Sequence, residues 1–177
     1  KSVIQGVGVR VIIGDKTGYA YTDEIEFDAI RRAAETASHI ARTGGSKQAS
    51  PVNATPNELN LYPVETPVSS VELATKIDLI KRGDESARRY DSRIREVQSS
   101  ITDEMKYVMI ASSDGRLVGD VQPMARFGLS CIADDDGNLQ VGRAGGGGRI
   151  GIDFFEKELT PEYLGGQAAR QAIIQLQ

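Results

Sequence analysis

The residues best suited to bind a ligand form a glycine segment near the carboxyl-terminal end of the chain. Four consecutive glycines, Gly145, Gly146, Gly147 and Gly148, are followed directly by Arg149. Glycine has no Cβ, so its backbone can adopt positive φ values and let another chain approach closely. Uncovered N–H and C=O groups can bond to an extended peptide, and an adjacent arginine can hold a carboxylate through two hydrogen bonds. We therefore predict a peptide-binding loop at these five residues, with a solvated connector before the last helix as the alternative.

The same segment matches a dinucleotide-binding pattern, Gly146-x-Gly148-x-x-Gly151. The surrounding sequence does not fit that pattern. No parallel βαβ unit follows, and the position about twenty residues further on, near Gln171, is not acidic. A Gly-Lys-Ser/Thr phosphate loop is also missing from the sequence. Nucleotide binding is therefore a weaker alternative.

Residues that could catalyse a reaction or hold a metal are scarce. The chain has one histidine, His39, and one cysteine, Cys131. We expect His39 on the surface of a helix, and Cys131 as a small buried residue that shares its strand face with Phe127 and Leu129. One histidine and one cysteine cannot form a zinc site without ligands from elsewhere. We predict no catalytic residue and no metal ligand within residues 1–177.

The composition is that of a globular protein. Of the 177 residues, 40% are hydrophobic and 26% are charged, which is enough to form a core. The net charge of −4 argues against direct nucleic-acid binding, and no apolar run approaches the roughly 18 residues of a membrane span. A single cysteine suits a reducing compartment, so we expect a cytoplasmic protein without membrane contact. Because the chain begins and ends inside patterned segments, we expect it to be a piece of a longer protein.

The first part of the chain predicts a hairpin and a helix. Alternating β-branched residues over 3–13 indicate a strand, and residues 18–22 its returning partner. Residues 26–42 change to a helical period with alanines on one side. Residues 43–70 hold four of the six prolines, which predicts an extended connection over the surface.

The second part predicts two more long helices and an antiparallel sheet. One helix begins at Ser69 or Ser70 and ends near Tyr90, and the last begins at Thr160-Pro161. Between them the alternation predicts five short strands: 93–101, 105–113, 117–122, 125–133 and 139–143. We expect the helices at 26–42 and 70–90 to cover one face of this sheet. The predicted fold is α+β, a two-layer α/β sandwich with a mostly antiparallel sheet and helices on one face, as a single domain over 1–177.

Several segments together resemble one known family. They are Gln5-Gly6-Val7-Gly8-Val9-Arg10, the block Gly14 to Tyr21, the Asp114-Gly115 turn, the strand 125–133 and the glycine segment, in this order. This combination resembles the amino-terminal domain of the TldD/PmbA family. Lys16-Thr17-Gly18-Tyr19-Ala20-Tyr21 and the glycine segment favour its TldD branch over its PmbA branch.

The resemblance implies a zinc metallopeptidase that acts as a dimer of identical or related subunits and matures or degrades small peptides. Older names call such proteins modulators of DNA gyrase. The family's zinc motif, His-Glu-x-x-x-His, lies in its carboxy-terminal domain and is absent from residues 1–177. The resemblance therefore implies a non-catalytic amino-terminal domain. Its role would be to frame the path of a peptide or unfolded-protein substrate toward a zinc bound outside this segment, and to contribute to the subunit interface. The alternative is a stand-alone binding or assembly module.

Overall fold

The computed structural model describes residues 2–42, 53–54 and 63–176. Backbone contacts divide the chain into two compact units, Lys1–Ala49 and Ser50–Gln177. Such units need not fold independently, so the single domain over 1–177 stays a prediction. Most of the predicted connection at 43–70, namely 43–52 and 55–62, lies outside the described residues.

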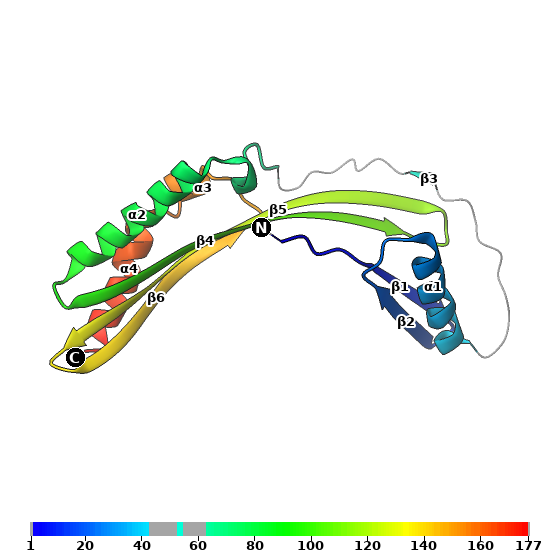
Figure 1. Cartoon of the computed structure of the whole chain (residues 1–177), viewed down its shortest axis with the longest axis horizontal. Coiled ribbons are helices and arrows are strands. Elements are labelled where there is room, and N and C mark those ends of the chain that lie inside the picture. Colours follow the sequence, from blue (N-terminus) through cyan, green and yellow to red (C-terminus); the bar gives the residue numbers. More distant parts are fainter. Residues whose placement is uncertain (1, 43–52, 55–62, 177) are drawn as a thin grey trace. The chain divides into compact units, whose positions relative to one another are not determined.

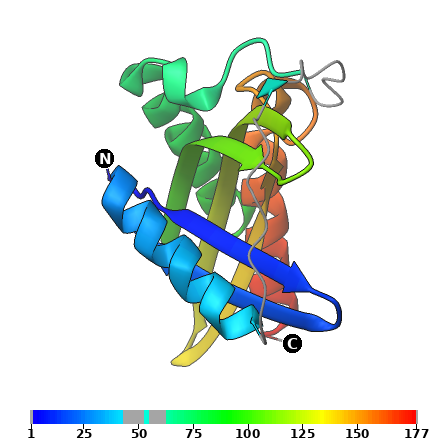
Figure 2. The same cartoon turned by 90° about the vertical axis from the view of Figure 1, so that its right-hand side faces the viewer.

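The first unit is a hairpin covered by one helix, as predicted. Strands β1 (Val7–Ile13) and β2 (Lys16–Thr22) pair antiparallel, and α1 (Phe27–Ala41) lies along them (Figure 2). Four alanines of α1 are buried: Ala29, Ala33, Ala37 and Ala41. A Cβ on Gly18 would lie 1.9 Å from the carbonyl oxygen of Ala37, so only glycine allows this close contact. The expectation that this helix covers the sheet of residues 93–143 is wrong, because its alanine face packs on its own hairpin.

The second unit contains three long antiparallel strands. They are β4 (Ile94–Ala111), β5 (Arg116–Asp135) and β6 (Asn138–Gly148), and the short β3 (Asn53–Ala54) pairs parallel with the start of β5. The five short strands predicted over 93–143 are thus three continuous ones. Pro123 does not interrupt β5, because β6 ends at Gly148, opposite Ala125, and no β6 ladder reaches Pro123.

The helices of this unit lie on one side of the sheet (Figure 1). After a 3-10 turn, η1 (Val68–Ser70), come α2 (Leu73–Tyr90), α3 (Phe154–Lys157) and α4 (Pro161–Ile174). The hydroxyl of Thr160 accepts a hydrogen bond from the Tyr163 N–H at 3.3 Å, which confirms the predicted start of α4.

From Ala125 to Ala133, every second residue of β5 faces these helices and contributes to the core of the unit. The buried strand residues are Ala125, Phe127, Leu129, Cys131 and Ala133. The intervening residues of β5 lie on the opposite face of the sheet, which we call the open face. The α+β fold, with mostly antiparallel sheets and helices on one face, is confirmed.

Candidate functional site

The glycine segment is part of a strand, so the predicted loop is wrong. Gly145 to Gly148 form the last four residues of β6 and pair with residues 128 to 125 of β5. A Cβ on Gly147 would lie 2.1 Å from the carbonyl oxygen of Ala125, and one on Gly145 would lie 2.8 Å from that of Phe127. The absence of side chains at these two positions therefore lets β6 pair closely with β5.

The outer edge of β6 has a defined pattern of hydrogen bonds. The Arg143 N–H donates to Oε1 of Gln171 at 2.6 Å, and the carbonyl of Val141 accepts from Nε2 of Gln175 at 3.3 Å. Odd-numbered residues of β6 thus direct their N–H and C=O groups away from β5. Because these directions repeat every two residues, Gly145 and Gly147 face the same way. No hydrogen bond from the rest of the described chain reaches their outward groups, so we call these two glycines the open edge.

Arg149 is engaged within the protein. Its Nη1 and Nη2 atoms each lie 3.1 Å from a carboxylate oxygen of Asp120, and Nη2 donates to the carbonyl of Val121 at 3.0 Å. A hydrogen bond from Gln122 and the ion pair with Arg149 hold the pKa of Asp120 below its usual value. A ligand carboxylate would therefore compete with Asp120 for this guanidinium. The predicted role of Arg149 in substrate binding stays a prediction.

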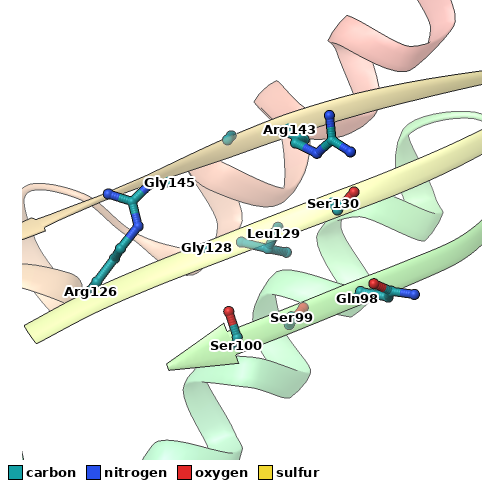
Figure 3. A pocket seen from close by; sticks show the side chains of 10 residues that line it. Gln98, Ser99, Ser100, Arg126, Gly128, Leu129, Ser130, Arg143 and Gly145 are labelled. Atoms are coloured by element: carbon teal, nitrogen blue, oxygen red, sulfur yellow. The ribbon is translucent and has the colours of Figure 1, made fainter. Parts of the chain in front are cut away.

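A hollow of about 580 Å³ lies on the open face, beside the glycine segment (Figure 3). Its lining residues on that face come from three strands: Gln98 and Ser100 of β4, Arg126, Gly128 and Ser130 of β5, and Arg143 and Gly145 of β6. Gly128 and Gly145 are directly opposite each other in the strand register, and neither has a side chain to fill the space. Large side chains therefore line the two ends of the hollow, whereas Ser100 supplies the one side chain at its middle.

The two arginines of this hollow were not among the predicted site residues. Arg126 alternates with the apolar residues Phe127 and Leu129, and this pattern already indicates a place on the solvent face of its strand. Nothing in the alternation shows that Arg143 lies on the same face, because its position depends on the pairing of β6 with β5. Of the predicted site residues, the structure brings Gly145 to the hollow and places Arg149 beside Asp120.

The described residues offer little catalytic chemistry. Cys131 is fully buried, as predicted, and burial raises the pKa of its thiol to about 11, which leaves very little thiolate at neutral pH. His39 is exposed on α1, also as predicted. No group of three or more histidine, cysteine, aspartate or glutamate side chains in the described ranges could hold a metal ion. No helix in that part of the chain is long and apolar enough to cross a membrane.

Two family models match the chain. Residues 66–176 match the PmbA/TldA metallopeptidase central domain, and residues 1–41 match the PmbA/TldA metallopeptidase domain 1. Among curated proteins, a metalloprotease TldD homolog of Buchnera aphidicola is 34% identical over 97% of this chain. Another, from Haemophilus influenzae, is 32% identical over 97% of the chain. The chain spans only 36% and 37% of the lengths of these two relatives.

Two solved structures share the fold. A protein of Thermotoga maritima named as a modulator of a DNA gyrase superposes with a TM-score of 0.64 at 22% identity, covering 95% of this chain and 37% of its own. A similarly named protein of Bacteroides thetaiotaomicron superposes with a TM-score of 0.70 at 14% identity, covering 95% of this chain and 39% of its own. At these identities the likeness concerns the fold alone.

Proposed function

Because this chain belongs to the PmbA/TldD metallopeptidase family, we propose that it is the non-catalytic amino-terminal part of a TldD-like zinc-dependent peptidase. In this role it holds an extended peptide, or an unfolded protein segment, on its path to a zinc ion bound by residues outside 1–177. The observation that carries this proposal is the open edge of β6 at Gly145 and Gly147.

An open strand edge can bind peptides of many sequences. A peptide that lies along β6 as an additional strand would bond to the outward N–H and C=O groups of Gly145 and Gly147 through its own backbone. Neither glycine has a side chain that would hold the peptide at a distance. Affinity then comes from main-chain pairing, which suits a peptidase that acts on varied peptides.

The described residues leave the chemistry of hydrolysis to the rest of the protein. They supply no three-ligand group for zinc, so no step of metal-assisted cleavage is assigned to them. We propose that the protein works in the cytoplasm and contacts neither DNA nor a membrane directly. The nucleotide-binding alternative is weakened, because the glycines pair within an antiparallel sheet and do not form a turn that leads into a helix.

Peptide binding is expected to protect the backbone amides of β6 in alternation. In the full-length protein, a bound peptide should slow the hydrogen exchange of the Gly145 and Gly147 amides about tenfold or more, because these two gain hydrogen bonds. The amides of Gly146 and Gly148 already face β5 and should change little. Hydrogen exchange at single-residue resolution, measured with and without a slowly cleaved peptide, checks this pattern.

The matched control is the Gly148→Ala variant, since a Cβ at this position meets nothing within 4 Å. It should bind the peptide with unchanged affinity and show the same alternation. Substitution of Gly145 or Gly147 is not informative, because a side chain there would disturb the pairing with β5 itself. Uniform protection of all four amides would contradict strand addition. A lack of protection at any of them would contradict it as well and would favour the assembly module.

The subunit contact that we propose lies on the far part of the β4–β5 ribbon, beyond the end of β6. Tyr107 and Val121 are directly opposite each other there, and Met109 follows on the same face. Tyr107 and Met109 are 76% and 75% exposed. A two-stranded ribbon has little stability by itself, and an exposed apolar strip of this kind is typical of a surface that another subunit covers.

Charge on this strip is expected to separate the subunits. The Tyr107→Glu, Met109→Glu double variant of the full-length protein should shift from dimer to monomer in sedimentation equilibrium. The dissociation constant of the dimer should rise by about a hundredfold. As a control, Glu substitution of Tyr163, an exposed tyrosine of α4, should leave the oligomeric state unchanged. A dimer of undiminished stability in the double variant would show that the subunits meet elsewhere.

A further inference from the structure

We infer that the hollow on the open face gives the protein a preference for acidic peptides, because Arg126 and Arg143 bind a carboxylate of the peptide that adds to β6. This inference rests on the proposed function and names the class of peptide that the surface selects. It follows from the strand register, the charges around the hollow and the position of the open edge.

The strand register arranges the residues of the open face in three rows. The first row is Gln98, Ser130 and Arg143, the second is Ser100, Gly128 and Gly145, and the third is Thr102, Arg126 and Gly147. Only a serine side chain occupies the middle row, so the space between the two arginines stays open. The two arginines stand four residues apart along the strands, about 13 Å. Figure 3 shows Arg126 toward one end of the hollow and Arg143 toward the other.

The charges around the hollow favour an anion. No aspartate or glutamate lines it, and Glu96, which accepts a hydrogen bond from Nε2 of Gln98 at 2.6 Å, lies just beyond its Gln98 end. Several other arginines of this unit are held by carboxylates, among them Arg82 by Glu156 and Glu162, Arg93 by Asp91 and Asp135, and Arg149 by Asp120. Within the described part of the chain, neither Arg126 nor Arg143 has an acidic side chain at ion-pair distance.

The lining groups match a carboxylate in their hydrogen bonding. A guanidinium presents a planar set of donors that can bond both oxygens of one carboxylate. The hydroxyls of Ser100 and Ser130 add two further donors on the same face. An acidic group can thus replace its water shell with several charge-assisted hydrogen bonds when it enters the hollow.

The open edge lies next to these donors. In neighbouring strands, directly opposite residues place their side chains on the same face of the sheet. A peptide residue opposite Gly145 therefore extends its side chain over the open face, past a position that has no side chain of its own. Arg143 is two residues from Gly145 on that face, so an aspartate or glutamate at this point of the peptide can reach the hollow.

The test measures the binding of labelled short peptides to the full-length protein by fluorescence anisotropy. The peptides share an alanine–serine sequence with a single central Glu or Gln, and each is made with a free and with an amidated carboxyl terminus. The Glu peptide should bind about tenfold more tightly than the Gln peptide, and high salt should reduce this preference. The amidated pair shows whether the bound carboxylate is that of the side chain or that of the peptide's terminus. If the terminal carboxylate is bound, the free-acid peptides bind more tightly than the amidated ones.

Removing the arginines should abolish the preference selectively. In the Arg126→Gln, Arg143→Gln double variant, the Glu and Gln peptides should bind equally, with the affinity that the Gln peptide has for the unchanged protein. The matched control is Arg170→Gln, which removes the same charge from the exposed surface of α4 on the other layer and should keep the preference.

The outcomes separate this inference from the proposed function. Equal binding of Glu and Gln peptides to the unchanged protein, with both terminal forms alike, overturns the inference but leaves strand addition intact. A preference that survives in the double variant overturns it as well. If no peptide binds, both proposals fail together, and tighter binding of a single-stranded oligonucleotide than of the Glu peptide would assign the arginines to phosphate instead.

Discussion

Replacing Gly142 by valine is expected to unfold the second unit of the protein. A Cβ on Gly142 would lie 2.0 Å from the carbonyl oxygen of Ala168 and 2.4 Å from the amide nitrogen of Ala172, both in the backbone of α4. Backbone atoms of a packed helix cannot rotate away as a flexible side chain can. The substitution therefore pushes α4 off the sheet and exposes the buried face of this helix, which includes Leu164 and Ala168.

The expected loss exceeds about 4 kcal/mol of unfolding free energy, among the largest effects of a single substitution. Urea unfolding of the full-length protein followed by circular dichroism measures it, and loss of soluble expression is the more extreme form of the same result. Gly148→Val is the matched control, because it lies in the same strand and its Cβ meets nothing within 4 Å. If the two variants unfolded at similar urea concentrations, the close contact between β6 and α4 would not be needed for stability.

Truncating Phe127 to alanine is expected to cost about 3–5 kcal/mol of unfolding free energy. Its side chain is fully buried, and its ring meets that of Phe155 edge to face, with 5.8 Å between ring centroids and 72° between ring planes. The variant loses this contact and leaves a cavity between β5 and the helices that the backbone can fill only in part.

The comparison is with the same substitution at Phe27, whose side chain is 81% exposed at the start of α1. The unfolding free energy of that variant should lie within about 0.5 kcal/mol of the value for the unchanged protein. The midpoint and slope of urea unfolding, measured for both variants, give the two values. A loss of less than about 1 kcal/mol for Phe127→Ala would mean that the core closes around the missing ring.

The local elements of this fold could be predicted from the sequence because their signals are local. The alanine face of α1 and the Thr160-Pro161 start of α4 each depend on residues within one or two helical turns. The alternation along 125–133 likewise placed Phe127 and Cys131 in the core. The family resemblance also came from short segments in a fixed order, which the comparisons confirm.

The partners of these elements could not be predicted in the same way. An amphipathic helix such as α1 indicates that one face must be buried, but it does not indicate which apolar surface will bury it. The predicted strands left a break between 122 and 125, and a loop was predicted at the glycine segment, yet strand pairing continues through both. The glycines are extended because they pair with β5, whose residues are about twenty positions away in the chain.

The α+β class, the start of α4 and the buried face of residues 125–133 could be predicted from local patterns in the sequence. Which polar groups meet depends on the folded sheet. Strand register places Arg143 beside Ser130 and Arg126 beside Gly147. The chain that follows β6 brings Arg149 to Asp120, 29 residues earlier in the chain. The physical reason is that alternation repeats every two residues along a strand, whereas register depends on the pairing of distant backbones. The side chains that surround the candidate site are therefore neighbours only in the folded sheet.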